Sequence, residues 1–128
     1  MFDKPEILGM SAAMAANAAT RMSAIAQNVA NADTPGYRAT DTADFAATYR
    51  SESGLRLAAT RPGHFAATPA STLMATSERA GGHLSPNGNN VSLEDEMMRA
   101  AMVRKDHDMA LAIYKKSLDI LRLSLGRR

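Results

Sequence analysis

The sequence predicts a mainly α chain, in which long N- and C-terminal helices form a coiled-coil-like layer and bracket an irregular or weakly β middle segment. Apolar residues recur at alternating spacings of three and four near both ends, as in helices that pack along a seam. The stretch between them shows no sustained period. We expect one structural unit with three parts: an N-terminal helix and turn (1–37), a flexible middle segment (38–91) and a C-terminal helix (92–128).

The first helix is expected over residues 4–31. Asp3 and Glu6 have the spacing of a capping box, and Pro5 is tolerated in a first turn. The predicted seam consists of Leu8, Ala12, Ala15, Ala19, Met22, Ala26 and Val29. The rest of the helix, including Ile25, is also largely apolar and carries little charge, so burial on several sides is expected.

A rigid turn is predicted where this helix ends, in the run from Ala26 to Arg38. Asn28 and Asn31 are three residues apart, so both amides are placed on one face of the last helical turn. Pro35 and Gly36 suit the second and third positions of a type II turn, the third of which requires a positive φ. An exposed Tyr-Arg pair is expected to follow.

The middle segment is predicted to be extended or loosely ordered. It is rich in Ala, Thr, Ser, Gly and Pro, and its larger apolar residues follow no helical or strand period. Short strands are expected around 55–60 and 64–68. The Gly-Gly pair at 81–82 and the run 86–90 are typical of turns.

The last helix is expected over residues 93–125. Ser92 is a good N-cap, three acidic residues follow in the first turn, and Gly126 is suited to end the helix. Such a helix would be about 50 Å long. One apolar stripe is formed by His107, Leu111, Tyr114, Leu118, Leu121 and Leu125. Further methionines and isoleucines widen the apolar surface beyond what one partner helix covers.

Composition and charge argue against several classes of function. The 128 residues include no cysteine, and the formal net charge is only +2, with basic and acidic residues interspersed. Neither a disulfide framework nor a nucleic-acid partner is therefore expected. His64, His83 and His107 are far apart, and helix neighbours of His107 point in diverging directions. We predict no metal, no cofactor, no small-molecule substrate and no enzymatic activity.

The N-terminus has some signal-peptide character, but Asp3 and Glu6 offset Lys4 where a positive region is needed. A cleaved signal is therefore not expected. From the residues alone, two helices with excess apolar surface favour a self-associating helical subunit, since contacts that do not close into a ring continue as a polymer.

Two motifs carry a family resemblance. The run from Asn28 to Arg38 resembles the signature of the bacterial flagellar rod and hook proteins, and the run from Asn89 to Met98 resembles the start of the C-terminal helix in short subunits of the proximal rod. The resemblance implies a structural subunit of the flagellar basal-body rod. Such subunits self-assemble through their terminal helices into the hollow drive shaft that links the rotor ring to the hook and transmits torque for motility.

The resemblance also implies partners and a location. The partners are other copies of the chain, neighbouring flagellar rod proteins, the protein at the junction between rotor ring and rod, and the flagellar type III export apparatus. The location is the periplasmic rod of the basal body, reached without a cleaved signal peptide. His107 departs from the aromatic residue that relatives often place there, which bears only on local packing.

By the same resemblance, the terminal helices form the channel-lining layer and the turn lies at contacts between subunits. The residues assigned to assembly are Leu8, Met22, Ile25, Asn28, Val29, Asn31, Thr34, Pro35, Gly36, Tyr37, Arg38, Leu111, Tyr114, Leu118, Leu121 and Leu125.

Two other function classes agree less well with the sequence. A helical adaptor or chaperone of the type III export system would form a stable dimer with an acidic surface, which the charge-poor N-terminal stretch does not favour. A small periplasmic enzyme would need a convergent polar cluster, and the sequence shows none.

Overall fold

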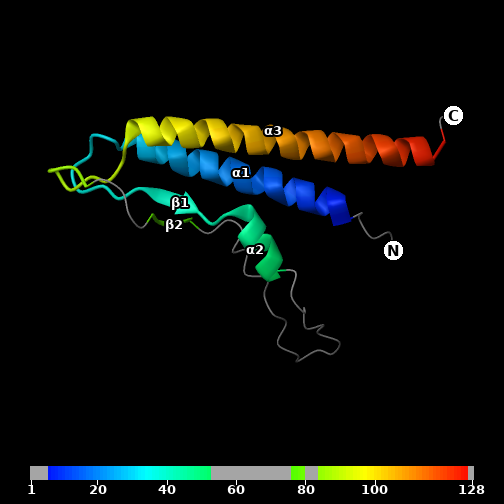
Figure 1. Cartoon of the computed structure of the whole chain (residues 1–128), viewed down its shortest axis with the longest axis horizontal. Coiled ribbons are helices and arrows are strands. Elements are labelled where there is room, and N and C mark those ends of the chain that lie inside the picture. Colours follow the sequence, from blue (N-terminus) through cyan, green and yellow to red (C-terminus); the bar gives the residue numbers. More distant parts are fainter. Residues whose placement is uncertain (1–5, 53–75, 80–83, 127–128) are drawn as a thin grey trace, which may run out of the picture.

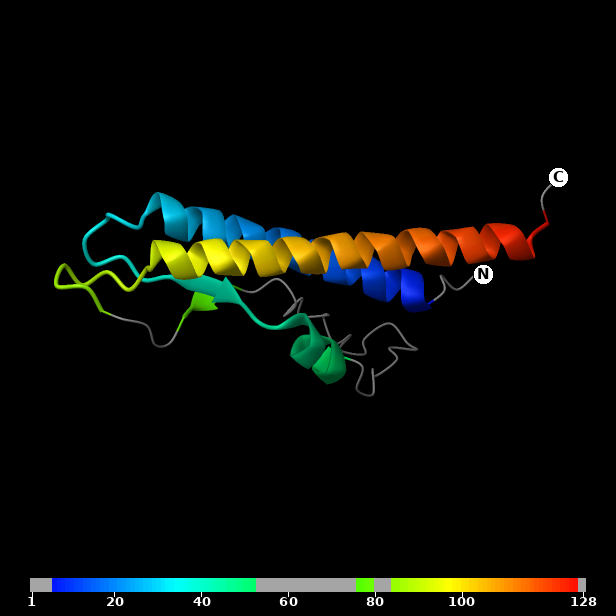
Figure 2. The ribbon, with the colours of Figure 1, turned by 45° about the horizontal axis from the view of Figure 1, so that its top comes forward.

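Two long helices lie side by side and run in opposite directions along the length of the molecule (Figure 1). The computed structural model describes residues 6–52, 76–79 and 84–126. Helix α1 spans Glu6–Ala30 and helix α3 spans Leu93–Ser124. The helices pack together over much of their length, and α3 extends beyond the start of α1 (Figure 2). The predicted mainly α fold with long terminal helices is confirmed.

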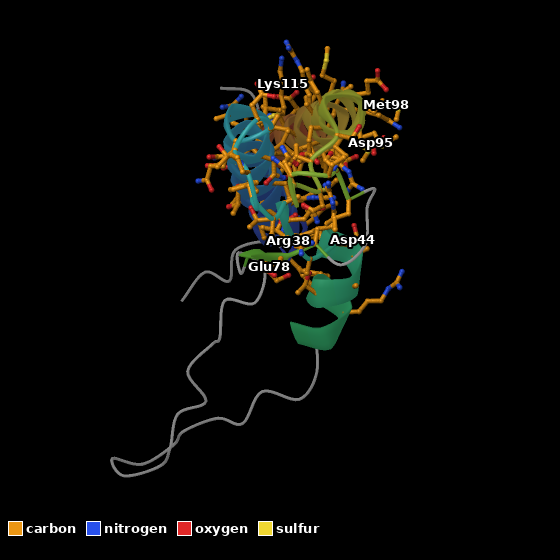
Figure 3. The ribbon with its side chains drawn as sticks, turned by 90° about the vertical axis from the view of Figure 1, so that its left-hand side faces the viewer. Arg38, Asp44, Glu78, Asp95, Met98 and Lys115 are labelled. Atoms are coloured by element: carbon orange, nitrogen blue, oxygen red, sulfur yellow. The ribbon has the colours of Figure 1, made fainter. Side chains whose placement is uncertain are left out.

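The described part of the middle segment contains a strand pair and a short helix. Strands β1 (Thr40–Thr42) and β2 (Thr76–Glu78) are antiparallel, with Thr42 opposite Thr76 and Thr40 opposite Glu78. Helix α2 spans Phe45–Glu52. These elements lie on one side of the helical pair, and no described element covers the other side (Figure 3).

The middle segment therefore differs from the prediction in two ways. Helix α2 was not expected, because it is too short to show a period. It begins with a bond from the Thr48 backbone N–H to the Asp44 carbonyl (3.1 Å), and the rings of Phe45 and Tyr49 lie 5.4 Å apart. The strands lie at 40–42 and 76–78, while the expected strands at 55–60 and 64–68 lie outside the described residues.

Several helix and turn boundaries follow the local chemistry that predicted them. The Ser92 hydroxyl accepts a hydrogen bond from the Asp95 N–H (3.4 Å) at the start of α3, and Gly126 has a φ of 76° just after its end. Gly36 has a φ of 72°, and the Tyr37 N–H donates to the Thr34 carbonyl over 3.3 Å, as the predicted turn requires. The proposed cap at Asp3 and Pro5 lies outside the described residues.

The predicted α1 seam is wrong for the contact between α1 and α3. Ala12, Ala19, Ala26 and Val29 are exposed, whereas the residue before each of them is buried: Ser11, Ala18, Ile25 and Asn28. A step of one residue turns the packing face by about 100°. The buried face was missed because it contains polar residues, which count against a hydrophobic seam.

The predicted apolar stripe of α3 also differs from the face of that helix that is buried. The buried residues of α3 are Glu96, Val103, Ala110 and Ser117, a strict seven-residue repeat. Leu111, Tyr114 and Leu125 of the predicted stripe are exposed, while His107, Leu118 and Leu121 are half-buried. Ala18, Ile25 and Val103 form the centre of the helical contact, with Met22 and Ala100 packed against them.

No described helix has the length and apolar character that a membrane crossing requires.

Candidate functional site

The two motifs that stood out in the sequence meet at one end of the helical pair. The turn after α1 and the turn before α3 lie next to each other there (Figure 1). The Gly36 N–H donates to the Asn87 carbonyl over 3.0 Å, and the Asn90 N–H donates to the Tyr37 carbonyl over 3.4 Å. Beside these turns lies a cluster of buried polar side chains, which we call the polar joint: Asn28, Asn89, Asn90 and Glu96.

Asn28 is the hub of the polar joint and is completely buried. Its amide nitrogen donates to the Thr40 carbonyl (2.8 Å) and to Oε2 of Glu96 (3.1 Å). Its amide oxygen accepts from the Thr40 N–H (2.9 Å) and from the Tyr37 hydroxyl (3.3 Å). One side chain therefore joins α1, β1 and α3, and both ends of its amide have partners, as burial of a polar group requires.

Glu96 is the buried charge of the polar joint, with no exposed surface. Its other carboxylate oxygen accepts from the guanidinium of Arg79, which follows β2 and is itself mostly buried. A carboxylate without solvent is tolerated only when charge and hydrogen bonds compensate it, and Arg79 and Asn28 supply both. The sequence predicted Glu96 only as a first-turn acid, because Arg79 is distant in the chain.

Asn89 stabilises the turn after α1. Its amide nitrogen lies within hydrogen-bond distance of three backbone carbonyls, those of Asn31 (2.9 Å), Ala32 (2.8 Å) and Thr34 (2.9 Å). Its amide oxygen accepts from the Val91 N–H over 2.7 Å. Backbone carbonyls of the turn that follows α1 are thus bound by a side chain from the turn that precedes α3.

Asn90 and Asp41 attach β1 to the rest of the molecule. The Asn90 amide oxygen accepts from the N–H of the fully buried Ala39 over 2.7 Å. Asp41 lies between two arginines, with Oδ1 3.3 Å from Arg21 of α1 and Oδ2 3.3 Å from Arg99 of α3. Because the two arginines come from different helices, Asp41 links both helices to the strand.

A cavity of about 190 Å³ lies between α1, α3 and the start of α2. Met14, Phe45 and Val103 contribute apolar walls, and its lining contains no histidine, serine or cysteine. Within the described residues, no three His, Cys, Asp or Glu side chains are grouped to hold a metal ion. Nδ1 of His107 lies 3.9 Å from Asp108 on the half-exposed surface of α3, and His64 and His83 lie outside the described residues.

Comparison with known proteins finds a similarity in these elements. Residues 8–38, which contain most of α1 and the whole turn, match the family described as flagella basal body rod protein. The flagellar basal body rod protein FlgB of Agrobacterium fabrum is 25% identical over 111 residues, and the alignment covers 84% of this chain and 83% of that protein. The chain is thus similar to flagellar basal-body rod proteins, both in the turn motif and over most of its length.

The turn residues assigned to assembly divide into half-buried and exposed groups. Tyr37 is half-buried and donates to Asn28, so the expectation of an exposed Tyr-Arg pair is wrong for Tyr37. Arg38 is exposed (Figure 3), as are Thr34, Pro35 and Gly36. Asn31 is half-buried, and its amide nitrogen bonds to the Gln27 carbonyl one turn back.

The helix residues assigned to assembly divide in the same way. Ile25 and Asn28 lie inside the helical pair, so they hold the two helices of one chain together. Leu8 and Met22 are half-buried. Val29, Leu111, Tyr114 and Leu125 are exposed, and Leu118 and Leu121 are half-buried.

Sequence reasoning missed the roles of several residues that hold the chain together. Arg79 and Asp41 were not singled out, and Asn89 and Asn90 were noted only as part of a motif, because each acts on a segment far away in the chain. One signal was available for two of them. Adjacent asparagines shortly before a capping serine are typical of side chains that bond to backbone in turns.

Proposed function

We propose that this chain is a subunit of the proximal rod of the bacterial flagellum, and that it self-assembles through its terminal helices into a hollow shaft. The shaft links the rotor ring to the hook and transmits torque for motility. The observation that supports this proposal is that much of the two apolar stripes found in the sequence remains exposed in the single chain.

The two stripes lie on the same side of the helical pair. On both helices, several stripe residues follow a buried position by one residue, a turn of about 100°: Ala12, Ala19, Ala26 and Val29 on α1, and Leu111 and Leu118 on α3. Since the helices are antiparallel, the same turn on each brings the stripes to one side. Asp41 of β1 contacts Arg21 of α1 and Arg99 of α3, so β1 lies on the opposite side of the helical pair. Lys115, which is next to Tyr114, lies away from β1 and α2 (Figure 3).

We call this side the open face. It is formed by Ala12, Ala19, Ala26 and Val29 of α1 and by Leu93, Met97, Leu111, Tyr114, Leu118 and Leu125 of α3. A group of exposed apolar side chains that spans two helices is typical of a surface that another protein covers. The α1 half carries no charged residue among its stripe positions, so a second helix would meet small apolar side chains there.

The composition of the core supports the same proposal. The buried hydrophobic residues of the described chain are four alanines, Ile25 and Val103. Alanine side chains remove little apolar area from water, so the hydrophobic contribution to the stability of one chain is small. Assembly would bury the open face and add the apolar burial that the core of one chain lacks.

The similarity to FlgB supports the finer assignments. We infer that the partners are other copies, neighbouring rod proteins and the protein at the junction of rotor ring and rod. We also infer that the flagellar type III export apparatus delivers the chain to the periplasm without cleavage of a signal peptide.

Two experiments test the proposal. Purified basal bodies that contain the tagged chain should carry the tag at the proximal rod, and its absence there would contradict the assignment. Circular dichroism and size-exclusion chromatography of the isolated chain should show a weakly folded monomer that orders on assembly. A compact monomer with a cooperative melt would argue against a polymer subunit, and a stable dimer would favour an export adaptor.

A further inference from the structure

The seam between α1 and α3 does not by itself determine how the helices are aligned along their length. In α1 the residues Ser11, Ala18 and Ile25 are buried at intervals of seven, and in α3 the residues Val103, Ala110 and Ser117 follow Glu96 at the same interval. A repeat of this kind is nearly unchanged when one helix slides by seven residues, a movement of about 10 Å.

Small side chains make this ambiguity greater. Apart from Ile25, Val103 and Glu96, the heptad-spaced positions hold alanine or serine. The serines bond within their own helices: Ser11 donates to the Leu8 carbonyl (3.2 Å) and Ser117 to the Ile113 carbonyl (2.9 Å). These bonds move with the helix, so they favour no particular alignment.

The polar joint is different, because most of its contacts join segments that are far apart in the chain. The bond from Asn28 to Glu96 connects residues 68 positions apart, and those from Asn89 reach back to the turn after α1. If α3 slid by one heptad, Asn28 and Glu96 would lose each other while one or both stayed buried. Buried polar groups without partners are strongly unfavourable, so this alignment is favoured over the others.

We propose that Asn28, Asn89 and Glu96 set the register of α1 against α3, and that the apolar seam contributes stability but not register. The three residues are positioning residues for the whole subunit, since the open face exists only when the stripes of both helices are aligned. Buried polar side chains that fix helix register at some expense of stability are known from coiled coils.

The test measures register directly. The chain has no cysteine, so two introduced cysteines carry spin labels without background. Ser23→Cys on α1 and Lys116→Cys on α3 are exposed and far apart along the axis, so a slide changes their separation by several ångströms, up to about 10 Å. Distances are recorded by pulsed electron resonance on the full chain, with trimethylamine N-oxide present to favour the folded state.

The labelled native chain should give one distance. The variant Asn28→Ala, Asn89→Ala, Glu96→Ala should give at least one further, displaced distance. The control Val103→Ala removes a seam contact of a buried residue, and it should melt earlier but keep the single native distance. The proposal is overturned if the triple variant keeps only the native distance, or if Val103→Ala shows displaced distances.

A second variant covers the case in which the triple variant loses its helices. Asn28→Leu with Glu96→Leu replaces the buried polar pair by apolar side chains and so leaves no unpaired buried charge in the seam. It should remain helical by circular dichroism and still show displaced distances. A single native distance in this helical variant would also overturn the proposal.

Discussion

The side-chain amide of Asn89 donates to the backbone carbonyl of Asn31 across 58 residues of sequence, over a distance of 2.9 Å. The same nitrogen is close to two further carbonyls of the turn, so one buried side chain satisfies much of the backbone after α1. This relationship ties the end of one terminal helix to the residue that leads into the other.

Replacement of Asn89 by alanine is expected to lower the free energy of unfolding by about 2 kcal/mol, because the turn carbonyls would lose the donor that the buried side chain supplies. Urea titration followed by far-ultraviolet circular dichroism, with trimethylamine N-oxide present to favour the folded state, measures this loss. Asn31→Ala is the matched control, since its amide nitrogen bonds only within its own helix end, to the Gln27 carbonyl. It should cost less than about 1 kcal/mol. Equal losses of stability for the two variants would show that the contacts of Asn89 contribute no more than a bond within one helix end.

Replacement of glycine by alanine should change the stability of the chain in opposite directions at Gly36 and Gly9. Gly36 has a φ of 72°, so Gly36→Ala should destabilise the chain by about 1 kcal/mol through backbone strain, although nothing crowds the new methyl group. Gly9 lies within α1 and is exposed, and a Cβ there also meets nothing. Gly9→Ala should stabilise the chain by about 0.5–1 kcal/mol. Thermal melts of both variants test the pair, and a loss of stability in Gly9→Ala would contradict the helical assignment at that position.

The link from Asp41 to both helices predicts a stability that depends on salt. Asp41→Asn should lower the free energy of unfolding by about 1 kcal/mol at low ionic strength, because Arg21 and Arg99 both lose their anion. The difference from the native chain should shrink in about 1 M salt, where charges are screened within about 3 Å. Asp119→Asn is the control, since its contact with Arg122 lies on the exposed surface of α3. It should have almost no effect at any salt concentration.

The helix ends and the turn could be predicted from the sequence, because each involves residues that are close together in the chain. Ser92 caps α3, Gly126 follows its end, and Gly36 has the positive φ that its turn needs. Each of these depends on backbone groups within a few residues. The presence of two long helices follows in the same way from apolar spacing over many turns.

The faces through which α1 and α3 pack together could not be predicted in this way. The buried positions include Ser11, Asn28, Glu96 and Ser117, which a search for apolar stripes rejects. Two of these polar side chains are satisfied within one helix turn, but Asn28 and Glu96 depend on each other across 68 residues. The apolar stripes that the sequence displays most clearly are those that one chain leaves uncovered. A hydrophobic pattern reports burial in the complete assembly, and it does not say which partner provides the burial.

The open face predicts a variant that assembles poorly although the single chain is intact. Leu111 is 49% exposed, so Leu111→Gln should change the free energy of unfolding by less than about 0.5 kcal/mol. The same change should reduce incorporation of the tagged chain into basal bodies, because it places a polar group in the centre of the face. Met102→Gln is the control: Met102 is also a large exposed residue of α3, but it lines a groove with Arg21 and Arg99 on the side that carries β1. Equal incorporation of the two variants would show that the open face is not the surface through which subunits meet.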